Sequence, residues 1–249
     1  MHGAPLSGDF DELAGDYDRF RTGYSSELFD ALGGFGFTAR KRVLDVACGT
    51  GISLEPLAAR GLRTAGVDPS AEMLAAARRR VPDADLTQGR AEALPFADAS
   101  FDAALSAQSF HWFDQAAALR EMTRVVRPGG PVAVWWKVLA ADDDVRRFRT
   151  AACRDVDLTP SEDVLKGGFG AFYAAPFARR ELRVIPHVAR STIAQWVGYE
   201  RSRAKARAYG DRRDAYLAAL EHRLLDVFKT PEARFEVHYM QYLYIGITA

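Results

Sequence analysis

The residues best suited to chemistry follow an apolar run and read VLDVACGTG, in which Asp45 precedes Gly49 and Gly51. Glycines at such a turn accept positive φ and let a ligand approach the backbone closely. A dinucleotide-binding fingerprint needs a third glycine three residues later, where this chain has Leu54. A P-loop needs Gly-Lys-Ser/Thr, which the sequence does not contain. Asp45 would repel a pyrophosphate, but it suits a ligand that carries an amino group and a cationic sulfur.

A second acidic position ends the next predicted strand, where AGVD places Asp68. A carboxylate there can accept hydrogen bonds from the two vicinal hydroxyls of a ribose. The alternative is an acid at the start of the helix that follows Pro69-Ser70. Together with the Gly-x-Gly turn, the ribose interpretation is favoured. The third predicted strand leads into QGRAEALPF, a turn suited to hydrogen-bonding an adenine edge while Met73 packs on the ring.

Aromatic residues gather after the fourth and fifth predicted strands, in AQSFHWF and at Trp135-Trp136. Ligands of open α/β sheets bind beyond the carboxyl ends of the strands, so these rings indicate a largely apolar pocket for an organic acceptor. Adjacent strand residues point to opposite faces, so at least one of the two tryptophans is expected in the core. His111 is the one histidine at this rim, and it suits either a general base or a group that orients the acceptor.

These residues need a parallel sheet to bring them together. From Arg42 to Lys137, short β-rich runs alternate with helical patterns, which predicts βαβ units with helices on both faces of the sheet. The periodicity before residue 35 predicts one or two amphipathic helices. After residue 139 we expect helices near 142–158, 191–209 and 211–228, a loop over GGFGAFYAAPF, and strands near 178–189 and 234–248.

The motifs VLDVACGTG, GVDPS, QGRAEALPF, SFDAALSAQSFHWF and LREMTRVVRPGG resemble, in order and spacing, those of class I S-adenosylmethionine-dependent methyltransferases. The resemblance covers residues 40–138. YDRFRTGYSSELFDAL also resembles the lid helix of the trans-aconitate-type and ubiquinone-biosynthesis-type small-molecule members. The family implies a Rossmann-like, open seven-stranded, mostly parallel sheet with a reversed C-terminal strand.

We expect one methyltransferase domain over residues 1–249, with lid helices in 1–35 and the cofactor-binding core in 40–138. Residues 139–229 would form a helical cap and the sixth strand, and residues 230–249 the last strand. The resemblance implies cofactor contacts from the lid and the strand ends by Tyr17, Arg21, Asp45, Gly49, Gly51, Asp68, Met73, Ala91, Glu92 and Gln108. The expected acceptor pocket comprises Phe110, His111, Trp112, Trp136, Trp196 and Tyr199.

Two of these assignments keep alternatives. Asp45 would fix either the turn or the amino group of the cofactor. Arg21 would close over the cofactor carboxylate or lie as a surface charge on an amphipathic helix.

The composition limits the classes of partner that the protein is expected to bind. The 249 residues hold 33 Lys+Arg and 33 Asp+Glu, so no net charge favours nucleic acid or an anionic membrane. The 48% hydrophobic content excludes a disordered chain, and two cysteines are too few for a disulfide scaffold. The histidines lack metal-ligand spacing. We expect a cytoplasmic monomer or homodimer without a metal.

The sequence therefore predicts methyl transfer from S-adenosylmethionine to a small organic acceptor. One alternative is a nicotinamide-dependent oxidoreductase on the same sheet. Another is an S-adenosylmethionine-binding protein with different chemistry, such as cyclisation or aminocarboxypropyl transfer.

Overall fold

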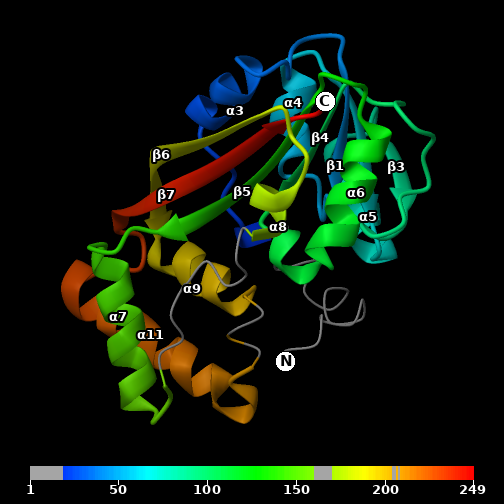
Figure 1. The fold of residues 1–249 in the computed structure, drawn as a ribbon. Helices are drawn as coiled ribbons and strands as arrows, with labels where there is room; N and C mark the ends of the chain where they lie inside the picture. Colours follow the sequence, from blue (N-terminus) through cyan, green and yellow to red (C-terminus); the bar gives the residue numbers. More distant parts are fainter. Residues whose placement is uncertain (1–18, 160–169, 204–205, 207) are drawn as a thin grey trace.

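Seven strands form one sheet in the computed structural model, which describes residues 19–159, 170–203, 206 and 208–249. Their order is β3-β2-β1-β4-β5-β7-β6 (Figure 1). The strands span Arg42–Val46 (β1), Arg63–Asp68 (β2), Asp85–Gln88 (β3), Ala103–Ala107 (β4), Pro131–Leu139 (β5), Arg179–Thr192 (β6) and Arg234–Ile247 (β7). β1 to β5 pair in parallel, whereas β7 runs antiparallel to both β5 and β6. The predicted mostly parallel sheet with a reversed last strand is confirmed.

Several helices begin at a residue whose side chain caps the first turn. Ser70 accepts a hydrogen bond from the N–H of Met73, Asp114 accepts one from Ala117, and Thr192 forms a capping box with Gln195. The α-helices span Ser26–Gly33 (α3), Leu54–Ala59 (α4), Ala71–Arg80 (α5), Gln115–Val125 (α6), Asp144–Asp155 (α7), Gly170–Ala174 (α8), Ile193–Arg201 (α9) and Arg213–Phe228 (α11), with 3₁₀ turns at Phe110–Trp112 (η1) and Gly210–Arg212 (η2).

The two faces of the sheet carry separate apolar cores, because successive strand residues point to opposite sides. Val43 packs in a cluster with side chains of α3 and α4. Its neighbour Leu44 packs in a cluster with α6 and Phe172 of α8. The same alternation continues in β5, where Trp135 belongs to the first cluster and Trp136 to the second. The two tryptophans therefore do point to opposite faces, and each is buried.

A helical cap of α7, α9 and α11 lies beyond the carboxyl-end side of β5 and β6 (Figure 1). Within the part of the cap that the structure describes, the apolar interior encloses a cluster of charged side chains. Glu200 of α9 forms ion pairs with Arg149 of α7 and Arg203, and it accepts a hydrogen bond from the Tyr216 hydroxyl of α11. The buried Glu200 carboxylate thus lies between two guanidinium groups and links the three helices. Removing any one of these charges would leave the remaining buried charges poorly compensated.

One local prediction differs from the structure. The segment GGFGAFYAAPF was expected as a loop, but it contains α8, whose Phe172 is buried against Phe177 and Tyr244. Burial of this aromatic ring favours the helix. Before residue 35, the described residues form helix at 19–20, no helix at 21–25, and α3 after the Ser25 cap, in agreement with the predicted one or two helices.

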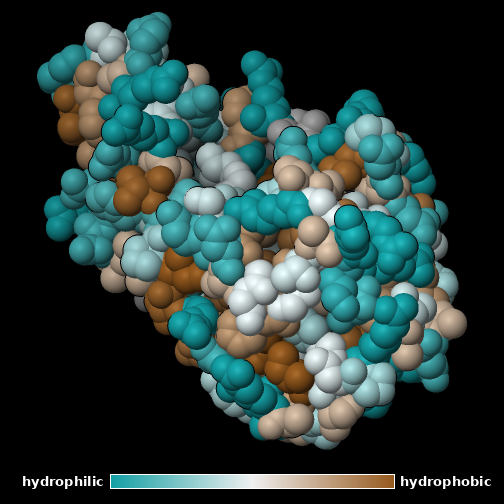
Figure 2. Space-filling view, turned by 90° about the horizontal axis from the view of Figure 1, so that it is seen from above, coloured by the Kyte–Doolittle hydropathy of each residue, from teal (hydrophilic) through white to brown (hydrophobic). Residues whose placement is uncertain are grey.

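The surface seen from above is mainly hydrophilic, and its hydrophobic residues lie in small separate patches (Figure 2). None of the helices in the described residues has the length and apolar character that crossing a lipid bilayer requires.

Candidate cofactor and acceptor site

The turn after β1 adopts a backbone that glycine favours. Gly49 has φ +53° and Gly51 has φ +80°. A Cβ at Gly51 would lie 3.4 Å from the Ala77 side chain of α5, whereas a Cβ at Gly49 would meet no atom within 4 Å. Gly51 therefore permits close helix packing, and Gly49 leaves open space at the carboxyl end of β1.

Asp45 is a fully buried carboxyl group at this turn. The Ser53 hydroxyl, just before α4, donates a hydrogen bond to its Oδ2 atom. Its Oδ1 atom has no hydrogen-bond partner among the described residues. Burial is the main cause that raises the pKa of Asp45 to about 8, and the nearby Asp68 carboxylate raises it further. A buried acid with an unsatisfied oxygen is a fitting partner for a ligand ammonium group.

Asp68 ties the end of β2 to the turn after β1. Its Oδ2 accepts a hydrogen bond from the backbone N–H of Gly49, and its Oδ1 accepts one from Ser70, both at 2.9 Å. The second bond joins Asp68 to the N–H of Ser70, the residue whose own side chain caps α5. A carboxylate has about four acceptor sites, so these bonds are compatible with ribose hydroxyls as further donors.

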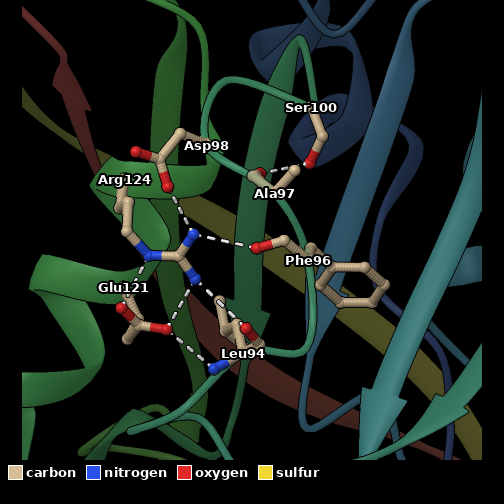
Figure 3. Close-up of polar contacts among 7 residues, drawn as sticks. All are labelled: Leu94, Phe96, Ala97, Asp98, Ser100, Glu121 and Arg124. Atoms are coloured by element: carbon tan, nitrogen blue, oxygen red, sulfur yellow. Dashed lines mark hydrogen bonds and ion pairs between the residues drawn. The ribbon is translucent and has the colours of Figure 1, made fainter.

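The loop between β3 and β4 is fixed by Arg124 of α6 (Figure 3). Its guanidinium donates to the carbonyls of Leu94 and Phe96 and forms ion pairs with Asp98 and Glu121. Glu121 in turn accepts a hydrogen bond from the Leu94 N–H at 2.8 Å. This fork-shaped contact holds the segment that follows the predicted adenine-edge residues.

Two of the predicted adenine contacts, Ala91 and Glu92, belong to that loop. Ala91 is buried within the apolar cluster of the α6 face, and Met73 is buried in α5. The Glu92 carboxylate accepts a hydrogen bond from the Asp114 N–H at 3.1 Å, which links the loop to the start of α6.

Gln108 joins the ends of β4 and β5. Its backbone has φ +61°, a left-handed conformation that is unusual for a residue other than glycine. Its N–H donates to the Trp135 carbonyl, and its side-chain Nε2 donates to the Lys137 carbonyl, each at 2.9 Å. Strained backbone of this kind concentrates at functional sites.

The acceptor rim is built from η1 and the end of β5. The Trp136 indole Nε1 donates a hydrogen bond to Nδ1 of His111 across 3.0 Å. The Trp112 ring lies 4.5 Å from the His111 ring, centroid to centroid, and is partly exposed. Phe110, by contrast, is only 1% exposed and packs edge-on against Trp136. The structure thus brings His111, Trp112 and Trp136 together and places Phe110 in the core beneath them.

Residues 19–25 lie between the cap and the sheet. Arg21 donates to the Ser202 hydroxyl and carbonyl at 3.1 and 3.3 Å, and its guanidinium lies 4.9 Å from the Tyr199 ring centre. The Phe20 ring occupies the space where a Cβ of Gly198 in α9 would stand. The beginning of the described chain is therefore docked on α9.

Lys137 of β5 anchors the same segment and was not identified from the sequence. Its buried ammonium group donates to the Thr22 carbonyl, the Thr22 hydroxyl and the Gly23 carbonyl at 2.7–2.8 Å. Burial, with a smaller contribution from Arg21, lowers the pKa of Lys137 to about 7. The only signal in the sequence was a lysine at the end of an apolar strand. Its partner residues lie more than 100 positions away in the chain, so no local pattern relates them to it.

The remaining predicted residues are placed as follows. Trp196 is buried in the cap core and stacks on Tyr199, so its ring faces the cap interior. Tyr17 lies outside the described residues. Among the residues that the structure describes, no group of three or more His, Cys, Asp or Glu side chains gathers as metal ligands.

The comparisons with known proteins agree with this geometry. A family model described as a methyltransferase domain matches residues 44–134. These residues belong to the methyltransferase-domain family. The class I, S-adenosylmethionine-dependent type expected from the motifs is supported by the sheet order and the relatives.

Among the relatives of this methyltransferase domain, an uncharacterized methyltransferase of Mycobacterium tuberculosis is 41% identical over 131 residues, 53% of each chain. A demethylmenaquinone methyltransferase of Renibacterium salmoninarum is 47% identical over 100 residues, 40% of this chain and 42% of the relative. The chain thus spans about half the length of the curated relatives it matches. A solved putative type II methyltransferase from Anaeromyxobacter dehalogenans is 28% identical, with a TM-score of 0.73 over 92% of this chain and 98% of that one.

Proposed function

We propose that this protein transfers a methyl group from S-adenosylmethionine to a small organic acceptor. The observation that carries the proposal is the fully buried Asp45 carboxyl group, whose Oδ1 has no hydrogen-bond partner among the described residues. An ammonium group donates to such an oxygen and compensates its burial. When bound, S-adenosylmethionine supplies an electrophilic methyl group on a sulfonium centre.

The chain's own residues bind and orient the reactants. Asp45 holds the amino group, Asp68 the ribose hydroxyls, and Glu92 with Ala91 the adenine edge. Gly49 lets the ligand approach the backbone, Gly51 lets α5 pack closely against the same turn, and Gln108 keeps the ends of β4 and β5 in register. Arg21 and Tyr17 belong to the segment proposed to cover the ligand. Methyl transfer is an in-line displacement, so positioning and exclusion of water supply most of the catalysis.

The acceptor is proposed to bind at the rim of His111, Trp112 and Trp136. Indole faces and a histidine favour a flat, largely apolar molecule with a polar atom at the reacting end. A quinol is one such molecule, and the relatives named demethylmenaquinone methyltransferase favour including it in a test. A base is needed only for an acceptor that must lose a proton, such as a phenol or a carbon acid.

The other chemistries on the same sheet remain testable alternatives. A nicotinamide-dependent oxidoreductase would need the third glycine of the fingerprint, where Leu54 begins α4. A cofactor-binding protein that performs cyclisation or aminocarboxypropyl transfer would share the site but leave the methyl group in place.

Calorimetry separates these alternatives. The intact chain is titrated with S-adenosylmethionine, S-adenosylhomocysteine and NADH, and only the first two should bind. Asp45→Asn should weaken both by at least tenfold, because a neutral amide cannot offer two acceptor oxygens. Asp85→Asn, an exposed carboxylate paired with Arg42, is the matched control and should leave binding unchanged. Binding of NADH alone would overturn the proposal.

Transfer itself is measured with methyl-labelled S-adenosylmethionine and a panel of a naphthoquinol, an aromatic carboxylate and an aromatic amine. Label in one of these acceptors supports methyl transfer. Consumption of cofactor with the methyl group retained on the sulfur product would instead indicate other chemistry. Light scattering on the same sample distinguishes a monomer from a homodimer, the two states that the sequence leaves open.

A further inference from the structure

The contact between Trp136 and His111 constrains where a proton can lie. An indole N–H is a donor only, and Trp136 Nε1 lies 3.0 Å from His111 Nδ1. Nδ1 must therefore supply a lone pair. A neutral imidazole with its lone pair on Nδ1 carries its hydrogen on Nε2.

The tryptophan is rigidly oriented, so the constraint is strong. Trp136 is 6% exposed, and its ring meets Phe110 and Tyr244 edge-on, with centroids 6.2 Å away in both cases. Tyr244 is paired with Val134 in the β5–β7 register, which fixes it from the neighbouring strand. Rotating the indole away from His111 would require two packed aromatic rings to move.

A general base must offer a lone pair to the acceptor's proton. In the tautomer that Trp136 imposes, the only ring lone pair of His111 is the one that already accepts the indole N–H. A proton arriving at Nδ1 would place two hydrogens between the rings. The geometry therefore favours donation from Nε2 and disfavours proton removal.

We propose that Trp136 is a positioning residue that holds His111 as the Nε2–H tautomer, so that His111 offers the acceptor a hydrogen-bond donor and takes no proton from it. Within the proposed methyl transfer, the acceptor then presents an oxygen or nitrogen lone pair to His111. A carboxylate, an already ionised phenol or an enolate oxygen matches this chemistry.

Nitrogen-15 NMR of the intact chain, recorded without any ligand, tests the tautomer directly. Long-range proton–nitrogen correlations should show His111 with an unprotonated Nδ1 and a protonated Nε2 at pH 7.5. A scalar coupling across the hydrogen bond should link Trp136 Nε1 to His111 Nδ1. A protonated Nδ1, or an equal mixture of tautomers, would overturn the proposal.

Trp136→Phe removes the N–H and keeps most of the ring. The His111 signals should then move toward a mixture of tautomers, whereas an unchanged spectrum would show that Trp136 does not set the tautomer. Trp135→Phe is the matched control, because that indole lies on the other face of β5 and its Nε1 has no partner among the described residues. Its His111 signals should match the wild type.

If Trp136→Phe does not fold, the coupling in the wild type still decides the question. The NMR result is also independent of cofactor binding. A confirmed tautomer in a protein that fails the calorimetry would overturn the proposed function and leave the Trp136–His111 relationship standing.

Discussion

The backbone N–H of Gly49 donates a hydrogen bond to Asp68 Oδ2 across 2.9 Å, which joins the turn after β1 to the end of β2. The two residues are separated by 19 positions and meet because β1 and β2 are parallel neighbours. The carboxylate that is proposed to hold a ribose thus also shapes the turn that is proposed to lie beneath the methionine part.

Asp68→Asn should therefore damage both folding and binding. A hydrogen bond to a charged group contributes about 1.5–3 kcal/mol, and the amide keeps only one acceptor oxygen for the Gly49 and Ser70 N–H groups. We expect the free energy of unfolding in urea to fall by about that amount and affinity for S-adenosylhomocysteine to fall at least tenfold. Asp85→Asn is the control, and equal effects from both variants would contradict the role assigned to Asp68.

Asp45 should make stability depend on pH. Its pKa is raised from 3.8 to about 8, so between these values the folded chain holds a proton that the unfolded chain has lost. Stability therefore falls as the pH rises across this window. Asp45→Asn should flatten the decline between pH 5 and pH 8 in urea unfolding.

The same group should report on cofactor binding. An ammonium group beside Asp45 favours the ionised form, so binding of S-adenosylhomocysteine at pH 7 should release a proton. Calorimetry in buffers of different ionisation enthalpy measures this release. Equal release by wild type and Asp45→Asn would rule out Asp45 as its source.

Lys137→Met should loosen the segment that precedes α3. The three oxygens of Thr22 and Gly23 would lose their buried donor, so amides 22–25 should exchange with solvent about tenfold faster, the effect of roughly 1–1.5 kcal/mol. Hydrogen exchange with mass spectrometry detects this. Lys41→Met, a half-exposed lysine paired with Asp102, should leave that segment unchanged.

Lys137 also gives a pH dependence of the opposite sign. Its pKa is lowered from 10.5 to about 7, so in this window the unfolded chain holds the additional proton. The contribution of Lys137 to stability therefore becomes less unfavourable as the pH rises from 7 to 10.5. Urea unfolding at pH 7 and pH 9 should show a smaller rise for Lys137→Met than for wild type.

Gly198→Ala should displace residue 20 from the cap. The new Cβ would overlap the Phe20 ring, so the ring must move and the contact with α9 is lost. Overpacking of this kind costs about 1–3 kcal/mol. Gly33→Ala, where no atom lies within 4 Å of the new Cβ at the end of α3, should instead be neutral or slightly stabilising. Thermal unfolding of the two variants in parallel gives the comparison, and similar melting temperatures would contradict the docking.

Arg124→Lys should release the loop between β3 and β4. A lysine keeps the charge but cannot bond simultaneously to two carbonyls and two carboxylates as the guanidinium does (Figure 3). We expect a loss of about 1–3 kcal/mol in unfolding free energy and faster amide exchange over residues 92–98. Arg120→Lys, on the exposed side of α6, serves as the control. Slow exchange in the Arg124 variant would show that the loop is held by other contacts.

The local motifs predicted most residues of the candidate site. Gly49, Gly51 and Asp45 could be predicted because a tight turn after a buried strand limits the backbone angle φ and the access of a ligand to the backbone. Both limits depend on residues that are neighbours in sequence. Asp68 could be found because parallel strands align their carboxyl ends. The alternation of short strands and helices likewise predicted the sheet, since period-2 and period-3.6 patterns are properties of the chain itself.

Other relationships were decided only by tertiary structure. Lys137 meets Thr22 across 115 positions, and Trp136 meets His111 across 25, through loops whose course no periodicity encodes. From the sequence alone, the roles of Lys137, His111 and Trp136 could not be assigned. In the folded core each polar group has few possible hydrogen-bond partners. Packing therefore places the buried Lys137 ammonium group against oxygens of the segment before α3, and the Trp136 indole N–H against one ring nitrogen of His111.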